Sequence, residues 1–250
     1  AANAGLSLAF TLHYFGSGRD ETWLKRADIA AKQALAADDQ LALAHVAQAW
    51  VLEYQGKRPQ AMQEVTAALN LEPSNLLGMY GKARLLIHAQ KFDLAQEVLD
   101  KAITLYPRNR PLISILGKLH YNLGNYTEAE KHFRKAIQID PHVANAYAQL
   151  SGTLDRLNRS DEALQVLQQG LQVHPDWELY TNLGNALFNR GDYLGAVQAF
   201  KKAVSDNKGG PGNYLLWANL ADAQRWVPGQ VESSRDSYRR AITLIQVMLR

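Results

Sequence analysis

Small and large apolar residues alternate along the chain with a helical spacing. Ala129 and Ala136 enclose Phe133 at spacings of four and three residues, which places all three on one face of a helix. The same pattern recurs with a period of about 34 residues, in the sets Ala61, Val65, Ala68; Ala95, Leu99, Ala102; Ala163, Leu167, Gly170; and Ala196, Phe200, Ala203. Because a small side chain lets two helix axes approach closely, the pattern predicts a series of helices that each pack against a neighbour.

Prolines follow four of these five predicted helices. They are Pro73, Pro107, Pro141 and Pro175, each 34 residues from the last, and Asp39 occupies the same register one step earlier. A proline lacks an N–H group and disfavours helical geometry in the residue before it, so it stops the helix. Its fixed φ also suits the entry to a following helix. We therefore expect each proline to lie between two helices.

A second helical pattern precedes each of the first. It contains a large residue followed by a small one, as in Leu116-Gly117, Leu183-Gly184 and Leu220-Ala221, which makes a notch for the partner helix. Between the two patterns lie the turns "YQGKRP", "NLGNY", "RLNRS" and "NRGDY", whose Gly or Asn supplies a left-handed helix cap. Runs of alternating β-branched residues are absent, so the sequence predicts an all-α protein.

The segment "LGKLHYNLGNYTEAEKHFRKAIQIDP" (116–141) resembles the tetratricopeptide repeat, a family with two antiparallel helices in each repeat of about 34 residues. The resemblance implies a right-handed α-solenoid of about seven antiparallel helix pairs, stabilised by contacts between neighbouring repeats. It predicts a single array over residues 1–250, with repeats near 8–41, 42–75, 76–109, 110–143, 144–176, 177–213 and 214–247. The first repeat matches weakly, and the last follows an irregular loop, "NKGGPGN".

Composition narrows the classes of function. Hydrophobic residues make up 47% of the 250, and there is no cysteine, so neither disulfides nor thiolate chemistry are expected. The 27 basic and 24 acidic residues are too balanced to favour nucleic-acid binding. No apolar run reaches the length of a membrane span. The opening "AANAGLSLAF" has neither an initiator Met nor a basic region, and we expect a processed chain or an excised domain.

Motifs of catalysis are missing from the sequence. There is no phosphate-binding loop, G-x-S-x-G or H-E-x-x-H motif, and the glycines at 16 and 18 follow no predicted strand. The seven histidines are scattered, and His120 and His132 are expected to pack or face solvent rather than bind a metal. We therefore predict no enzyme activity, no metal and no cofactor.

The first helix of each repeat lines the concave face of a stacked array, and its exposed stripe is the candidate binding surface. In repeats two to four this stripe carries aromatic and cationic residues: Trp50, Tyr54, Tyr80, Arg84, Lys118 and Tyr121. Aromatic residues and arginine are favoured at binding centres. The alternative is that Trp50 and Tyr80 only fill space between helices.

In the later repeats the same stripe is rich in amides. Its residues are Asn145, Gln149, Arg156, Asn182, Asn185, Asn219 and Asp222. Gln149, Asn182 and Asn219 share one place in the repeat, and a side-chain amide both donates to and accepts from a peptide backbone. This row resembles the asparagine ladder with which some tetratricopeptide superhelices hold extended peptides. The alternative is that the amides cap their own helices or bridge neighbouring repeats.

The carboxylate clamp by which some family members bind chaperone tails requires Lys and Asn at two fixed places of one repeat. Those places hold Val46 and Trp50, Tyr80 and Arg84, and Ser114 and Lys118. The clamp is therefore not expected, and a receptor for chaperone tails is disfavoured.

The final repeat, "YLLWANLADAQRWVPGQVESSRDSYRRAI" (214–242), is similar to the closing repeat of arrays that end certain bacterial Ser/Thr kinases. No kinase motif is found in the chain itself. The resemblance implies a regulatory or scaffolding part of a larger bacterial signalling protein. That setting leaves the compartment open between the cytoplasm and, if a membrane span precedes the array in the parent, the periplasm.

Two functions follow from these observations. The first is a non-enzymatic module that binds a protein or an extended peptide, without nucleic acid and without insertion into a membrane. The alternative is self-association, in which a homodimer brings fused catalytic domains together. The apolar end "AITLIQVMLR" motivates this alternative, because a terminal repeat normally carries a polar outer face.

Overall fold

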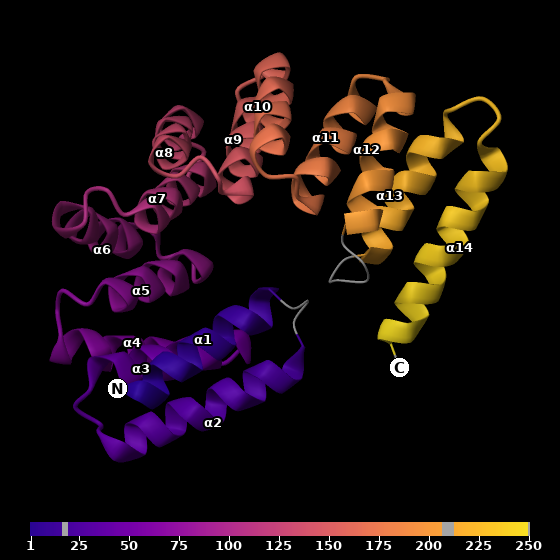
Figure 1. Cartoon of the computed structure of the whole chain (residues 1–250). Coiled ribbons are helices and arrows are strands. Elements are labelled where there is room, and N and C mark those ends of the chain that lie inside the picture. Colours follow the sequence, from indigo (N-terminus) through magenta and orange to yellow (C-terminus); the bar gives the residue numbers. More distant parts are fainter. Residues whose placement is uncertain (17–19, 207–212, 250) are drawn as a thin grey trace. The chain divides into compact units, whose positions relative to one another are not determined.

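A computed structural model describes residues 1–16, 20–206 and 213–249, and every element in this part of the chain is a helix (Figure 1). The prediction of an all-α protein is confirmed. The chain divides into two compact units, Ala1–Leu123 and Gly124–Arg250, and each is described by itself.

The first unit consists of seven helices packed as successive hairpins. They are α1 (Ala2–Gly16), α2 (Glu21–Ala37), α3 (Ala42–Tyr54), α4 (Arg58–Leu71), α5 (Leu76–His88), α6 (Phe92–Leu105) and α7 (Arg110–Asn122). Each of α1, α3 and α5 packs against the helix that follows it, and also against the next first helix in the series α1, α3, α5, α7. This is the two-layer contact pattern of a helical repeat array.

The second unit has seven helices arranged in the same way. They are α8 (Tyr126–Ile139), α9 (Ala144–Arg156), α10 (Ser160–Val173), α11 (Trp177–Asn189), α12 (Tyr193–Asp206), α13 (Asn213–Arg225) and α14 (Val231–Met248). The hairpins are α9/α10, α11/α12 and α13/α14, and the first helices α9, α11 and α13 also contact one another in sequence.

The boundary between the units falls in the turn after Leu123, between the two helices expected for the repeat 110–143. In the first repeat, α1 begins at Ala2 rather than near residue 8. A single array over residues 1–250 stays a prediction.

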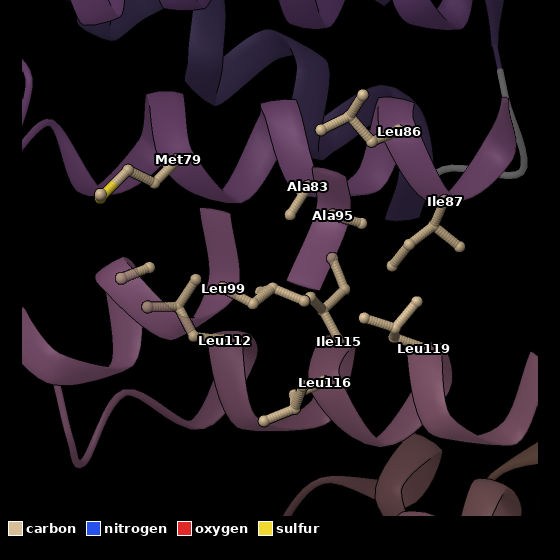
Figure 2. Packing of buried hydrophobic residues seen from close by; sticks show 11 residues of the cluster. Met79, Ala83, Leu86, Ile87, Ala95, Leu99, Leu112, Ile115, Leu116 and Leu119 are labelled. Atoms are coloured by element: carbon tan, nitrogen blue, oxygen red, sulfur yellow. The ribbon is translucent and has the colours of Figure 1, made fainter. Parts of the chain in front are cut away.

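The helix faces predicted to carry small residues form the core. The small residues of these faces, from Ala61 to Ala203, are all buried, and so are the large residues Val65, Leu99, Phe133, Leu167 and Phe200 between them. In the first unit, Leu99 lies at the centre of a cluster from α5, α6 and α7 (Figure 2). The register assigned to these helices from the sequence is confirmed.

Two glycines show how closely the helices approach. A Cβ atom added at Gly184 would lie 2.5 Å from Cε1 of Phe200, so the ring of α12 fills the notch predicted in α11. At Gly170, which replaces the second alanine of its repeat, a Cβ would lie 2.8 Å from Cγ of Tyr147. Contacts under 3.0 Å are not tolerated without movement, so alanine does not fit at either position.

The turns between paired helices use a left-handed residue, as predicted. Gly56, Gly124, Asn158 and Gly191 have φ between 60° and 79°. The same conformation occurs at Gln90, with φ of 56°, a position that the sequence did not mark as a turn residue. Glutamine is disfavoured there because its Cβ crowds the backbone in this region. The surrounding helices α5 and α6 therefore impose the turn on it.

The role expected for the prolines is half right. The residues before them end the helix, as predicted, and two of them, Asp140 and His174, are extended. However, the prolines lie in a short turn and not in the first turn of the next helix. Side chains of Asn75, Asn109 and Asp176 cap the helices that follow, each accepting a hydrogen bond from a backbone N–H.

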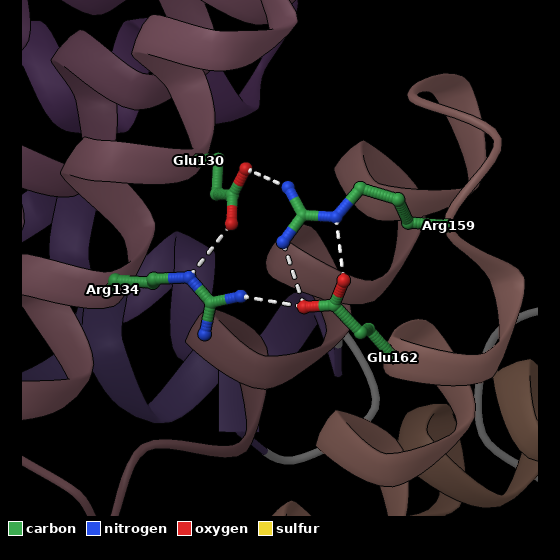
Figure 3. Close-up of polar contacts among 4 residues, drawn as sticks. All are labelled: Glu130, Arg134, Arg159 and Glu162. Carbon is green, nitrogen blue, oxygen red and sulfur yellow. Dashed lines mark hydrogen bonds and ion pairs between the residues drawn. The ribbon is translucent and has the colours of Figure 1, made fainter.

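A closed ring of ion pairs connects two second helices of the second unit (Figure 3). Arg159 donates to both oxygens of Glu162, over 2.6 and 2.7 Å, and to Glu130 over 2.6 Å. Arg134 completes the ring with hydrogen bonds to Glu130 (2.8 Å) and Glu162 (3.4 Å). The forked contact of Arg159 fixes both its position and its orientation. The ring therefore connects α8 to the start of α10.

Ala136→Leu tests the packing of these helices. Because Ala136 has no exposed surface, the larger side chain should lower the free energy of unfolding by about 1–3 kcal/mol through overpacking. Chemical denaturation monitored by circular dichroism measures the change. The matched control is Gln138→Leu, at an exposed position of the same helix, for which we expect a change within about 0.5 kcal/mol. Equal stability of the two variants would contradict the close approach.

Candidate protein-binding surfaces

The residues predicted to bind a ligand all lie on the first helices of the hairpins. Six of them belong to α3, α5 and α7 in the first unit: Trp50, Tyr54, Tyr80, Arg84, Lys118 and Tyr121. Seven belong to α9, α11 and α13 in the second unit: Asn145, Gln149, Arg156, Asn182, Asn185, Asn219 and Asp222. They fall into two groups, one in each unit.

Trp50 is not on the surface of the first unit. Only 9% of it is exposed, and it joins the core cluster of Val46 and Ala68, so the expectation of an exposed Trp50 is wrong. Its ring lies 6.1 Å from that of the half-buried Tyr80, measured between centroids. The space-filling alternative holds for Trp50, which supports Tyr80 from within the core.

Arg84 is engaged inside the first unit. Its guanidinium donates a hydrogen bond of 2.7 Å to Glu53 of α3, interacts with the Tyr54 hydroxyl, and lies 5.5 Å from the centroid of the Tyr80 ring. Burial raises the pKa of Glu53, although the nearby cations, Arg84 above all, act in the opposite direction. Arg84 therefore connects α3 to α5, and its guanidinium is already engaged by Glu53 and Tyr54.

Two other cations, Arg58 and Lys118, lie near the pair of Arg84 and Glu53. Neither Arg58 nor Lys118 forms an ion pair or hydrogen bond with another residue in the described part of the chain. Both lie near enough to Glu53 to influence its pKa. The pKa of His88, at the end of α5, is lowered by partial burial and then by Lys118, Arg58 and Arg84. The ends of α3, α5 and α7 thus carry an excess of positive charge.

The two remaining tyrosines are half-buried. Tyr54 meets Tyr14 of α1 edge-on, with 5.6 Å between ring centroids, so it also braces the first hairpin. Tyr121 lies on α7, one turn beyond Lys118. Both have further polar or ring interactions within the protein.

The amide row of the second unit lies on three consecutive first helices. Gln149, Asn182 and Asn219 are each half-buried, and no side-chain hydrogen bond from them to another described residue is found. The Oε1 atom of Gln149 is fully covered and has no hydrogen-bond partner among the described residues. A covered acceptor without a partner is costly, because it has lost its water without compensation.

A desolvated carboxylate lies beside this row. Burial raises the pKa of Glu178, and the charge of Asp176 adds to the effect, while a hydrogen bond with Asn145 opposes it. Asp176 itself caps α11 by accepting a hydrogen bond of 2.7 Å from the Glu178 backbone N–H. Asn145 of α9 is therefore occupied by a residue of the neighbouring repeat, although the bridging alternative concerned Gln149, Asn182 and Asn219.

The other residues predicted on this surface differ in availability. Arg156 donates to the Tyr126 hydroxyl over 3.1 Å and stacks above its ring, and Asp222 accepts a hydrogen bond from Tyr238 of α14. Asn185 is exposed. The residues that the sequence missed are Glu53, Arg58, His88 and Glu178. Three of them carried a signal, because they occupy places of their repeats that belong to the predicted stripe. Glu53 stands at the place of Tyr121, His88 at that of Tyr54 and Glu178 at that of Asn145. Arg58 lies outside the stripe, and no pattern in the sequence indicated it.

The described residues contain no group of three His, Asp or Glu side chains that could hold a metal ion. Among them there is also no helix both long and apolar enough to cross a membrane.

Glu178→Gln tests the desolvated carboxylate. Because the folded-state pKa is raised, the contribution of Glu178 to stability is fully present below its ordinary pKa of 4.5 and is lost as pH rises through the folded value. The variant should therefore gain stability relative to wild type as pH rises through this window. Urea denaturation at several pH values from acid to neutral measures the difference.

Glu162→Gln is the control of opposite sign. Hydrogen bonds from Arg159 lower the pKa of Glu162, so its stabilising contribution is present above pH 4.5 and is lost as pH falls. This variant should be less stable than wild type at neutral pH and should approach it in acid. Parallel pH profiles for the two variants would contradict the assignment.

Solved structures share this fold. A tetratricopeptide repeat protein from Parabacteroides merdae superimposes with a TM-score of 0.69 at 20% identity, covering 88% of this chain and 84% of that one. A chain of the APC/C hetero-tetramer Cut9-Hcn1 gives a TM-score of 0.67 at 20% identity, covering 87% of this chain and 42% of that one. At this identity the likeness concerns the fold alone.

Curated relatives match over part of their length. The Hsp70-Hsp90 organizing protein of Triticum aestivum is 32% identical over 110 residues, which are 44% of this chain and 18% of that protein. Protein FlbA of Caulobacter vibrioides is 28% identical over 187 residues, which are 72% of this chain and 30% of that protein. The chain therefore corresponds to less than a third of the length of either relative.

Sequence models of the tetratricopeptide repeat match residues 46–110, 120–187 and 178–208. Together they cover more than half of the chain, and their matches fall on the helix hairpins described above. The periodic small residues, the left-handed turns and the hairpin architecture agree with these matches. The chain belongs to the tetratricopeptide repeat family.

Proposed function

We propose that the chain is a non-enzymatic module that binds a protein or an extended peptide on the first-helix surfaces of its hairpins. The observation that carries this proposal is the row of Gln149, Asn182 and Asn219 on α9, α11 and α13. These amides have no hydrogen-bond partner among the described residues, although each is half-buried.

A row of this kind suits an extended backbone. Successive first helices repeat the amide at one place, and a peptide presents N–H and C=O groups at regular intervals along its length. Each exchange of a water hydrogen bond for an amide one contributes about 0.5–1.5 kcal/mol. Since association costs several kcal/mol of lost freedom, three amides do not give tight binding alone. The row therefore sets direction and conformation, and other contacts supply affinity.

In the first unit, Tyr80 is the aromatic residue best suited to supply affinity. It is partly exposed, with its ring held between Trp50 and Arg84. A side chain fixed in this way loses little freedom when a ligand binds, which favours a role as a binding hot spot.

The wider role is that of a regulatory or scaffolding part of a larger bacterial signalling protein, such as a Ser/Thr kinase. The similarity of residues 214–242 to the closing repeat of kinase arrays supports this context. A relative named for organising Hsp70 and Hsp90 is in line with protein binding. Chaperone tails are not the proposed ligand, because Val46 and Ser114 stand where the clamp requires lysine.

Peptides selected from a displayed random library on the full chain test the binding function. For a selected peptide that contacts the second unit, Asn182→Ala should weaken binding by less than about 1.5 kcal/mol and leave the fold intact. For one that contacts the first unit, Tyr80→Ala should cost about 2 kcal/mol or more. Calorimetry measures both, with Gln138→Ala, an exposed change on a second helix, as the control.

A library that gives no binding peptide would contradict the binding function. Equal losses for Asn182→Ala and Gln138→Ala would contradict the role of the amide row and leave peptide binding itself standing.

Self-association is a second candidate, favoured by exposed apolar residues toward the end of α14. The residue after the second small position is half-buried in the other repeats, as at Leu69 and Ile103, but Ile242 is 54% exposed. Val247, Met248 and Leu249 are also exposed, and Leu249 is 77% exposed. A second copy of the chain could cover such residues.

Light scattering coupled to size exclusion distinguishes the two candidates. If α14 mediates a homodimer, the measured mass should rise toward twice 27.9 kDa with increasing concentration. The double variant Ile242→Lys and Val247→Lys should then remain at the monomer mass. A wild-type monomer at every concentration would exclude this candidate.

A further inference from the structure

The ends of α3, α5 and α7 in the first unit carry more positive charge than the fold requires. The carboxylate of Glu53 lies at the end of α3, and its side chain is only 8% exposed. Arg84 neutralises it at 2.7 Å. Arg58 and Lys118 lie near the same carboxylate, yet they form no ion pair or hydrogen bond with the described residues.

Compensation of helix dipoles does not explain all of these charges. Lys118 and His88 lie toward the C-terminal ends of α7 and α5, where a cation is favourable. Arg58 is the first residue of α4, at the positive end of that helix, and no side chain caps it. A cation at that end adds to the partial positive charge of the free N–H groups. The charge of Arg58 is therefore unfavourable for α4, and its favourable interaction is with the buried Glu53, which Arg84 already neutralises.

We propose that Arg58, His88 and Lys118, called here the basic cluster, anchor a carboxylate-rich segment of a protein partner to the first unit. The proposal rests on the peptide-binding function above and names the chemistry of the ligand. An acidic segment supplies the negative charges that the cluster lacks, and the half-buried Tyr121 lies one turn beyond Lys118 on α7. Arg84 is a positioning residue, because Glu53 already occupies its guanidinium.

His88 makes the cluster measurable. Its pKa is lowered by burial and by three cations, and no acidic group contributes to the shift. A bound carboxylate would offset that positive potential and raise the His88 pKa. An uncharged ligand of the same shape would not. The titration of His88 thus reports the charge of what is bound, independently of affinity.

The experiment uses the full chain and two short peptides, acetylated and amidated, one alternating glutamate with alanine and one alternating glutamine with alanine. We expect the glutamate peptide to bind at least about tenfold more tightly at low salt, and to weaken as salt screens the charges. Arg58→Gln and Lys118→Gln should each weaken it at least about fivefold. Lys101→Gln, an exposed lysine of α6, is the matched control and should change nothing.

Nuclear magnetic resonance of the His88 ring, assigned with a His88→Gln variant, provides the second readout. Its pKa should rise with the glutamate peptide and stay unchanged with the glutamine peptide. Equal binding of the two peptides, or an unchanged His88 pKa at saturation, would overturn the inference. If library peptides still bind through the amide row in that case, the proposed function survives and only the ligand chemistry is wrong.

Other anions are distinguished in the same assay. Inorganic phosphate or a single-stranded oligonucleotide that displaces the glutamate peptide at a lower concentration, and raises the His88 pKa at least as much, would overturn the acidic peptide as the occupant. Weak displacement that follows ionic strength alone supports the proposal, since it reflects screening rather than recognition.

Discussion

The close approach of neighbouring helices is the constraint on which the rest of this structure depends. The helices of a hairpin such as α9/α10 are 13 and 14 residues long. A hairpin of this size cannot bury its own apolar face, so it is stable only when a neighbouring helix pair covers it. Close approach requires small residues at the crossing points, and Ala129, Ala136, Gly170 and Gly184 supply them. Where Phe200 fills the notch at Gly184, a single methyl group is already too large.

This constraint also determines which helix faces remain as candidate binding surfaces. Each second helix buries its small-residue face against neighbouring helices, while each first helix has one stripe that lies outside the core. The stripe is nevertheless not uniform. Trp50 is buried in the core, and Arg84 is paired with Glu53. The side chains of the first unit that remain as candidates for contact with a ligand are therefore Tyr80, Arg58 and Lys118. In the second unit, amides at one place of the repeat stay without partners among the described residues.

The charged side chains of the protein fall into two kinds: those that pair with one another between helices, and those that we propose bind a ligand. The ring of Glu130, Arg134, Arg159 and Glu162 gives each member a charged partner and connects α8 to the start of α10 (Figure 3). Arg58 and Lys118 of the basic cluster have no such partners among the described residues. The pKa of His88 is lowered first by burial and then by Lys118, Arg58 and Arg84. A bound carboxylate would offset the effect of these cations.

The sequence by itself determined the helical class, the regular repeat period, the buried register and the left-handed turns, because each of these follows from local spacing and backbone preference. It also located the first helices that carry the candidate surfaces. Only the tertiary structure decided which residues of the stripe are available. Burial of Trp50 and pairing of Arg84 with Glu53 depend on contacts between residues of different repeats, which no local pattern encodes. Within one repeat, the packing of α5 on α6 likewise outweighs a local preference, because Gln90 between these helices adopts a left-handed conformation that glutamine disfavours.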